Sequence, residues 1–546
     1  MDETKDDTTN DTKDDTGDDG ITRGDLLKTA AGAGVAVLGT RAATADAQTQ
    51  AKPRRTSGNK VAGMNVLLFL TDQQRAVQHF PPEWTKRNMP GLDRLQRHGL
   101  TFNNAFTNAC MCSPARSTLM SGYFPAQHGV KYTLEADMPA SKKYPQVELA
   151  LSFANPASVV AAAGYTPVYK GKFHCVKAAA GDDNWVPEDV NQYGFTRWNP
   201  PDAGANQDVS EEGGGTYNND GRFMNQDGSA SAGTEGAVQY LQQAAADAQP
   251  FFLVVSLVNP HDVLLYPKNY TTAGYDNSWL QGQVEPPATV NEDLSTKPSV
   301  QAQFLKIFNL SGPIPTHQMK RNYLNFYGNL MKSSDAYLVK LLNTLTSTGL
   351  LENTLVIATA DHGEMGTAHG GLRQKNFNFY EESLRVPLVY SNPRLFKKAR
   401  TSDALVSHVD FLPTLASLVD APSSARSDWA GVDYSDQILS AAPKSPQNYT
   451  VFTYDDFQSG QKSPPYPTPP NHIVSIRETR YKLARYYDVH HRVAPQYEMY
   501  DLKTDPLERV NLAWKGHKRT PSQEREYKRL RLKLEHVERT RLQPLS

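Results

Sequence analysis

The sequence of 546 residues is poor in cysteine and carries almost no net charge. Its three cysteines, Cys110, Cys112 and Cys175, are too few for a disulfide-rich scaffold. A formal net charge of -1 gives no overall field that would attract nucleic acid. The apolar run from Ala30 to Gly39 is shorter than the roughly 20 residues that cross a bilayer. We therefore expect no disulfide scaffold, no nucleic-acid partner and no stable membrane insertion.

The first 50 residues differ in composition from the rest of the chain. They open with a stretch rich in Asp and Thr that has no apolar side chain to bury, so we expect disorder there. Arg23 and Lys28 precede the short apolar run, and a small-x-small site at Ala45 to Ala47 follows it, which is the layout of an export signal. This predicts an exported protein, periplasmic or extracellular, with an Ala/Gly-rich linker as the alternative. Gly24 stands where a twin-arginine signal has its second arginine, so a Tat-like and a Sec route both stay open.

From Asn65 onward, apolar runs of strand length alternate with segments of helical spacing. Residues 65–70, 251–258 and 354–360 are the clearest strands, and their continuous apolar character is typical of strands covered on both faces. This alternation favours an α/β fold with a largely parallel central sheet. We assign residues 60–440 to this α/β domain.

The sequence pattern changes after about residue 440. Residues 472–487 predict two strands joined by a turn, and residues 521–542 predict a closing amphipathic helix. Lys and Arg in that helix are interspersed with Glu, so a solvated face is favoured over a nucleic-acid patch. Residues 441–546 are therefore predicted to form a smaller C-terminal α+β subdomain.

The three predicted strands end in polar residues of one chemical kind. Asp72 follows the first, His261 the second, and Asp361 with His362 the third. In open α/β sheets, ligands bind beyond the carboxyl ends of the strands. A single Asp after a strand is usually a turn or a helix cap. Three such strand ends together favour an oxygen-rich site for a divalent cation.

Cys112 stands in the stretch NACMCSPARSTLMSG, immediately before a predicted helix. Ser113 can cap that helix and Pro114 can occupy its first position, which places Arg116 in the first turn. The free N–H groups and the dipole of a helix N-terminus favour a bound oxyanion beside Cys112. The alternative, a buried structural thiol, requires none of these features.

At this point the chain resembles the type I, formylglycine-dependent sulfatases of the alkaline phosphatase-like superfamily. CSPAR followed by STLMSG resembles their C-x-P-x-R signature, with Ala115 where the family often has serine. Further matches follow in the family's order: NVLLFLTDQQR, GYTPVYKGKFHC, NPHDV, ADHGEMGTAHGGLRQKNFNFYEESLRVPL, SHVDFLPTL and YEMYDLKTDPLERVNLA. The resemblance implies a large mixed, mostly parallel sheet flanked by helices, and a sulfuric ester hydrolase.

The resemblance also implies a modified nucleophile and one metal ion. A formylglycine-generating enzyme would convert Cys112 to formylglycine (3-oxoalanine), whose hydrate attacks the sulfate ester. The implied ligands of one divalent cation, most often Ca2+, are Asp72, Gln73, the converted Cys112, Asp361 and His362. Gln73 stands where the family often has a second aspartate, and its amide oxygen can ligate a hard cation without adding charge.

The remaining implied roles concern charge and protons. Arg116 would neutralise charge at the nucleophile, while Lys172 and Lys375 would hold the sulfate oxygens. His261, helped by Lys375, would protonate the leaving oxygen, and His174 would take the proton from the hydrate so that sulfate departs. Histidine suits both tasks because its ordinary pKa lies near neutrality.

Several residues keep two interpretations. His369 could line the substrate pocket or cap its loop, whereas His408 and Asp410 are predicted to cap a helix rather than act in catalysis. Residues 217–224 could form a specificity loop. Two free buried thiols are favoured over a disulfide between the two remaining cysteines.

Two other functions compete with a sulfatase that takes a small-molecule or glycan sulfate ester. A phosphonate monoester or phosphodiester hydrolase of the same fold often carries glutamine after the first aspartate, so Gln73 and His362 keep this alternative open. An exported binding protein that is never modified belongs to a different class. The intact set of Cys112, Arg116 and the Lys and His residues argues against it.

Overall fold

The computed structural model describes residues 59–545, with internal gaps. The gaps are residues 77–78, 136–137, 139, 142–143, 182–183, 205–208, 226–234, 248, 308–311, 441–443 and 462–463. The predicted acidic segment and export signal of residues 1–50 lie outside the described residues. Within them, every helix is too short or too polar to cross a bilayer.

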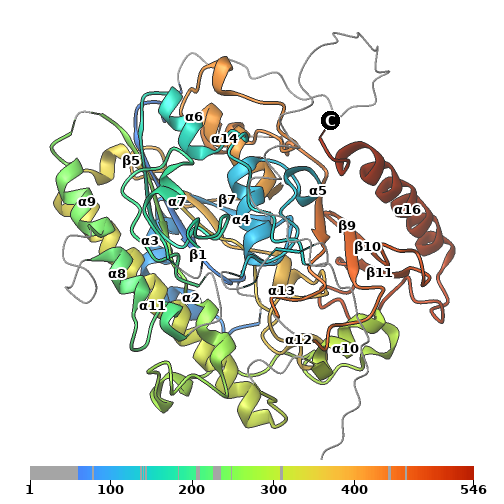
Figure 1. The fold of residues 1–546 in the computed structure, drawn as a ribbon. Helices are drawn as coiled ribbons and strands as arrows, with labels where there is room; N and C mark the ends of the chain where they lie inside the picture. Colours follow the sequence, from blue (N-terminus) through green and yellow to red (C-terminus); the bar gives the residue numbers. More distant parts are fainter. Residues whose placement is uncertain are drawn as a thin grey trace, which may run out of the picture.

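A seven-stranded sheet forms the centre of the molecule (Figure 1). The strands, in spatial order, are β3 (Thr166–Gly171), β4 (Phe251–Ser256), β1 (Asn65–Thr71), β5 (Thr354–Ala360), β6 (Leu388–Ser391), β2 (Gly99–Phe106) and β7 (Arg400–Ser407). All neighbouring pairs are parallel except those that involve β6, which runs antiparallel to β5 and β2. Every residue of β1, β4 and β5 is buried, as their continuous apolar character predicts. The predicted fold class is confirmed.

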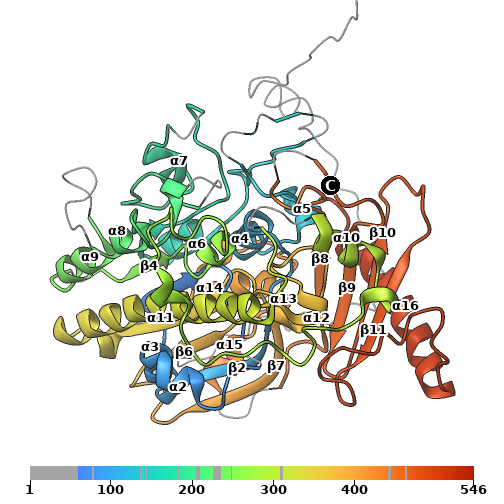
Figure 2. The same cartoon turned by 90° about the horizontal axis from the view of Figure 1, so that it is seen from below.

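Helices cover both faces of this sheet, as Figures 1 and 2 show. Val66, Leu68 and Leu70 of β1 belong to the core of one face, whereas Leu67 and Phe69 belong to the core of the other. The first core includes α4 (Cys112–Ser121), α6 (Pro156–Ala162), α7 (Glu188–Asn191), α14 (Phe411–Leu418) and α15 (Ser435–Leu439). The second includes α2 (Trp84–Asn88), α3 (Pro90–Arg97), α8 (Asn219–Met224), α9 (Ala237–Ala244) and the long α11 (His317–Ser347). Because helices cover both faces of this sheet, a ligand can reach it only at the ends of its strands.

The C-terminal region forms a second, antiparallel sheet of four strands. Its spatial order is β11 (Gln496–Asp501), β10 (Tyr481–Tyr487), β9 (His472–Glu478) and β8 (Tyr449–Tyr454). Helix α16 (Pro521–Arg541) buries Leu530, Leu534 and Val537 against this sheet and lies at the edge of the molecule (Figure 1). A third core, which contains α10 (Ser299–Ile307) and the short α12 (Ala368–Gly371) and α13 (Glu381–Leu384), joins the two sheets. The short α5 (Pro125–His128) follows α4.

Candidate active site

Four neighbouring parallel strands carry most of the predicted site residues to one edge of the central sheet. The residues that follow them are Lys172 and His174 (β3), His261 (β4), Asp72 and Gln73 (β1), and Asp361 and His362 (β5). Parallel strands place their carboxyl ends together, which is why residues almost 300 positions apart in the chain become neighbours. Helix α4 adds Cys112 and Arg116 from above this edge.

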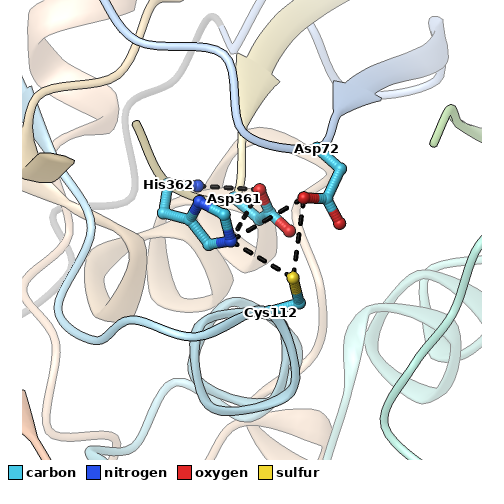
Figure 3. A group of neighbouring side chains, drawn as sticks. All are labelled: Asp72, Cys112, Asp361 and His362. Carbon is cyan, nitrogen blue, oxygen red and sulfur yellow. Dashed lines mark hydrogen bonds and ion pairs between the residues drawn. The ribbon is translucent and has the colours of Figure 1, made fainter. Parts of the chain in front are cut away.

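Cys112, Asp72, Asp361 and His362 form one buried cluster (Figure 3). The Sγ of Cys112 lies 3.2 Å from Nε2 of His362 and 3.5 Å from Oδ1 of Asp72. Nε2 of His362 is also 3.7 Å from Oδ1 of both aspartates. The four potential ligand atoms all lie within 4.8 Å of one another, so one metal ion can contact the whole set.

The imidazole of His362 is oriented toward the carboxylates by its own loop. Its Nδ1 lies 3.1 Å from the carbonyl oxygen of Gly363, a contact in which Nδ1 carries the proton. Nε2 then presents its lone pair to the cluster. Burial and the charge of Lys375 lower the pKa of His362 well below its usual range. The ring is therefore neutral, which is the form that ligates metals.

Arg116 compensates the two carboxylates from the opposite side. Its Nε donates to Oδ2 of Asp361 at 2.9 Å and its Nη2 to Oδ2 of Asp72 at 3.2 Å. Its Nη1 donates at 2.8 Å to the carbonyl oxygen of Lys172 and at 2.8 Å to Oγ of Ser256. Each aspartate thus uses Oδ2 for Arg116 and turns Oδ1 toward His362 and Cys112, and Oδ1 of Asp361 also accepts the N–H groups of Gln73 and His362.

The two aspartates differ in their electrostatic surroundings. Burial alone would raise the pKa of Asp72, but Lys172 (Nζ at 2.7 Å from Oδ2) and the other nearby positive groups hold it well below its usual range. Burial and the charge of Asp72 raise the pKa of Asp361 to about 7. A divalent cation between them would favour the ionised form of both groups.

Gln73 brings Lys375 into the site. Its backbone has φ 67°, in the left-handed region, and its N–H donates to Oδ1 of Asp361 at 3.0 Å. Its Oε1 accepts a hydrogen bond from Nζ of Lys375 at 2.6 Å, and its Nε2 donates to Glu364. An amide oxygen has two lone pairs, so the contact with Lys375 leaves one for a metal ion.

The two predicted proton-transfer residues lie at the ends of neighbouring strands. His174 is buried, and its Nε2 lies 2.7 Å from the carbonyl oxygen of Leu134, so Nδ1 is the unprotonated nitrogen. Its ring is neutral because burial and Lys172 lower its pKa well below the usual range. His261 alone among the predicted site residues is partly exposed. Burial of its ring and the charges of Lys172 and Lys375 lower its pKa too.

Helix α4 begins two residues earlier than the sequence predicts. Met111 is its N-cap, and Oγ of Ser113 instead accepts the N–H of Leu134 at 3.0 Å. Pro114 still lies in the first turn, where an N–H has no partner within the helix. The expected helix N-terminus at Cys112 is therefore present, although Ser113 does not cap it.

The three cysteines are free and buried. Sγ of Cys110 is 3.8 Å from the carbonyl oxygen of Ser383, and Sγ of Cys175 is 3.4 Å from that of Phe173. The prediction of two unpaired thiols is confirmed.

His369 and Asp410, for which the sequence left two interpretations open, make contacts that support the fold. The ring of His369 stacks on Tyr380 at 3.6 Å, and its Nδ1 lies 2.7 Å from Glu292, which ties three loops together. Asp410 stands at the N-cap position of α14, but its side chain makes no capping hydrogen bond to that helix; it accepts the N–H of Ser407 at 2.7 Å and closes the short turn His408–Asp410 instead. Neither residue belongs to the cluster around Cys112.

Sequence reasoning missed Glu364, which lies beneath the site. Its carboxylate accepts hydrogen bonds from Gln73, Tyr323 and the backbone of Gln374, and it is fully buried. The signal in the sequence is an acidic residue three positions after Asp361, within the stretch ADHGEMGTAHGGLRQK that resembles the family. Glu364 fixes the amide of Gln73 and therefore the position of Lys375.

Comparisons with known proteins agree with this geometry. A family model described as Sulfatase matches residues 64–421, and one described as N-sulphoglucosamine sulphohydrolase, C-terminal, matches residues 369–539. An ulvan-active sulfatase of Formosa agariphila is 26% identical over 426 residues, which cover 77% of this chain and 72% of the relative.

Two solved structures show the same fold. A 2-O GAG sulfatase matches with a TM-score of 0.66 at 21% identity, over 87% of this chain and 92% of that chain. A phosphonate monoester hydrolase of Agrobacterium radiobacter matches with a TM-score of 0.59 at 20% identity, over 87% and 95%. The family model spans more than half of the sequence, and the chain therefore belongs to the sulfatase family, the enzymes that hydrolyse sulfuric esters.

Proposed function

We propose that this sulfatase uses a formylglycine made from Cys112, together with one divalent cation, to cleave a sulfate ester of a glycan. One observation carries the proposal: the side chain of Cys112 lies at the start of α4 and within 3.2 to 3.5 Å of two potential metal ligands. An oxygen on this side chain would occupy the same position. A side chain that merely fills the core would not need these neighbours.

An unmodified thiol is a poor nucleophile in these surroundings. Burial and the carboxylates of Asp72 and Asp361 raise the pKa of Cys112 to about 12. Since the thiolate is the reactive form, almost none would be present at neutral pH. Conversion to an aldehyde, whose hydrate offers two hydroxyl groups, removes this obstacle and gives a covalent route.

The donor atoms fit a hard cation. Oδ1 of Asp72, Oδ1 of Asp361, the amide oxygen of Gln73 and an oxygen at position 112 form a mainly oxygen set, which calcium prefers, and His362 adds one nitrogen. When bound, the cation would polarise the sulfate oxygens and favour the ionised hydrate. Lys172 and Lys375 would hold the remaining sulfate oxygens as point charges.

His261 and His174 would handle the protons on the two sides of the reaction. His261 is the partly exposed group, where the alcohol part of the substrate can reach it, and would protonate the leaving oxygen. The anionic ester would neutralise the lysines that lower the pKa of His261 and so favour its protonated form. His174, whose Nδ1 has no hydrogen-bond partner among the described residues, would accept the proton of the residue-112 hydroxyl when sulfate leaves.

A sugar hydroxyl is the leaving group that we propose. One relative is named as ulvan-active and one solved neighbour as a 2-O GAG sulfatase, so glycan substrates occur among the similar proteins. Alcohols of this kind are poor leaving groups, and a general acid such as His261 matters most for them. The natural substrate would arrive after export, which we propose from the signal-like layout of residues 21–47; sequencing the N-terminus of the mature protein tests it.

The first experiment compares turnover of 4-nitrophenyl sulfate and a phenyl phosphonate monoester, each with added calcium and with a chelator. We expect a strong preference for the sulfate that disappears on chelation. The tryptic peptide that contains Cys112 should show the mass of formylglycine. A preference for the phosphonate would refute the choice of substrate, and an unmodified Cys112 in an active enzyme would refute the nucleophile.

A further inference from the structure

One buried aspartate holds the backbone of His174, and a second holds the backbone two and three residues before His261, the other histidine that we assign to proton transfer. Asp202, which is fully buried, accepts the N–H of Phe173 through Oδ1 and the N–H of His174 through Oδ2, both at 2.7 Å. Two consecutive amides thus share one carboxylate. His174 has φ 52°, in the left-handed region that residues other than glycine rarely adopt, so this turn needs such support.

Asp220 makes the same arrangement one strand further along the sheet. Its Oδ1 accepts the N–H of Val258 at 2.7 Å and its Oδ2 the N–H of Asn259 at 3.0 Å. These residues lead from β4 to His261. Asp220 is 1% exposed and lies in α8 (Asn219–Met224), so most of the suggested specificity loop, residues 217–224, is a packed helix.

A reciprocal contact fixes the second loop more firmly. Asp262, the residue after His261, accepts the N–H groups of Gly213 and Gly214 at 3.1 and 3.0 Å. A Cβ on Gly213 would lie 2.7 Å from Oδ2 of Asp220, which explains why a glycine stands there. Hydrogen bonds in both directions therefore join the segment that leads into α8 to the loop of His261, so a shift of one segment changes the support of the other.

We infer that Asp202 and Asp220 are positioning residues, each of which sets the place of one histidine for a different half of the reaction. The inference rests on the proposed function, because it assumes the roles of His174 and His261. Neither aspartate touches the cluster around Cys112 in any contact of the described structure. Both act through backbone amides, so their effect on chemistry passes through the ring that the backbone carries.

Because the two histidines act in different halves of the reaction, replacing each aspartate should change the kinetics in a different way. In the first half, one hydroxyl of the residue-112 hydrate, already ionised by loss of its proton to water, bonds through its oxygen to sulfur; the ester S–O bond breaks, and the leaving alcohol oxygen takes a proton that His261 supplies. In the second half, His174 removes the proton of the other hydroxyl, the bond between carbon and the sulfate oxygen breaks, the aldehyde returns and sulfate leaves. A displaced His261 therefore slows alcohol release, and a displaced His174 slows sulfate release.

The test replaces one carboxylate oxygen by an amide nitrogen. In Asp220→Asn and Asp202→Asn, one backbone N–H would face an NH2 group and lose its acceptor. Turnover is measured on aryl sulfates whose phenols range from acidic to weakly acidic. For Asp220→Asn we expect kcat/KM to fall about 10- to 100-fold on the weakly acidic phenols and little on 4-nitrophenyl sulfate.

For Asp202→Asn we expect a different result. The kcat should fall by a similar factor of about 10 to 100 on all phenols, while kcat/KM changes little. A burst of phenol equal to the enzyme concentration should precede the steady state, and the peptide of residue 112 should retain a sulfuryl group by mass. A structural defect alone would lower kcat/KM on every substrate and give no burst.

Asp335→Asn is the matched control. Asp335 is also buried and also accepts two consecutive amides, those of Gly91 and Leu92 at 2.7 and 2.8 Å, but these amides belong to α3, which carries none of the predicted site residues. Its kinetics should match the wild type. If all three variants lose activity alike, or if the loss in Asp220→Asn is independent of the phenol, the inference is wrong.

Two further measurements distinguish a failure of this inference from a folding defect and from a failure of the proposed function. If an Asn variant does not fold, as judged by circular dichroism, the corresponding Glu variant must show the same signature, and its absence overturns the inference. If the wild type itself has no turnover or an unmodified Cys112, the proposed function fails instead, and with it the assumption behind the two roles.

Discussion

Replacing Arg116 by methionine should reveal how strongly the two buried carboxylates depend on their counter-charge. The guanidinium is completely buried and donates to Asp361, Asp72, the carbonyl oxygen of Lys172 and Ser256 at 2.8 to 3.2 Å. Removal of one partner from a buried ion pair costs about 3–5 kcal/mol, because the other charge remains buried. Lys172 still compensates the charge of Asp72, so Asp361 is the carboxylate that loses its ion-pair partner. We therefore expect Arg116→Met to lose about 3–5 kcal/mol of unfolding free energy in chelator.

Calcium should reduce this loss. With Arg116 absent, the two carboxylates lack one positive charge and bind a divalent cation more tightly, so the variant gains more stability from calcium than the wild type does. A ligand at about 100 times its Kd adds about 2.7 kcal/mol. The assay is urea unfolding with and without calcium, with the midpoint compared at unchanged slope.

A surface arginine provides the control. Arg480 pairs with Asp501 through two contacts of 2.7 and 2.9 Å, but its side chain is 50% exposed, so Arg480→Met should be nearly neutral. A loss below about 1 kcal/mol for Arg116→Met in chelator, or equal stabilisation of both proteins by calcium, would refute the reasoning.

Three further predictions follow from the same contacts. Cys112→Ser should lower kcat on 4-nitrophenyl sulfate by at least about 100-fold, because serine lacks the second hydroxyl that expels sulfate; retention of activity within a few-fold would contradict the nucleophile. His261→Ala should cost about 100-fold or more on weakly acidic phenols and less on 4-nitrophenol, and an equal loss on both would exclude a general acid. Although burial opposes it, pairing with Glu292 and Glu382 raises the pKa of His369 to about 9, so its stabilisation is complete below pH about 6.5 and is lost as pH rises through 9. His369→Gln should therefore flatten the urea-unfolding profile between pH about 7 and 10 by up to about 3 kcal/mol, and parallel profiles of the two proteins would disprove this.

The strand ends were the part of the site that the sequence predicts best. Asp72 and Asp361 each follow an apolar run whose burial on both faces is evident from composition, and parallel pairing then brings them together. Cys112 and Arg116 are predictable for a local reason, since four residues of one helix turn separate them. Local periodicity and strand order therefore account for the metal-like cluster.

Contacts between distant loops could not be predicted in the same way. The bond between Gln73 and Lys375 joins residues 302 positions apart, and no periodicity links them. The glycine-rich stretch before residues 217–224 favours a loop there, yet Asn218 caps α8 and the helix packs inward. The position of Ser113 before proline predicts a helix cap, but in the folded chain its hydroxyl oxygen accepts the N–H of Leu134.

The burial of Cys112 determines when the proposed conversion to formylglycine can take place. Only 1% of this residue is exposed, and its neighbours Met111 and Ser113 are buried as well, so a modifying enzyme cannot grip this segment in the folded protein. The proposed conversion must therefore happen on the unfolded chain, before α4 docks on the strand ends. Purified, folded and unconverted protein should resist the modifying enzyme, whereas a peptide of residues 108–122 should be converted readily. Under the proposed mechanism, a molecule that folds before conversion would therefore remain without its nucleophile.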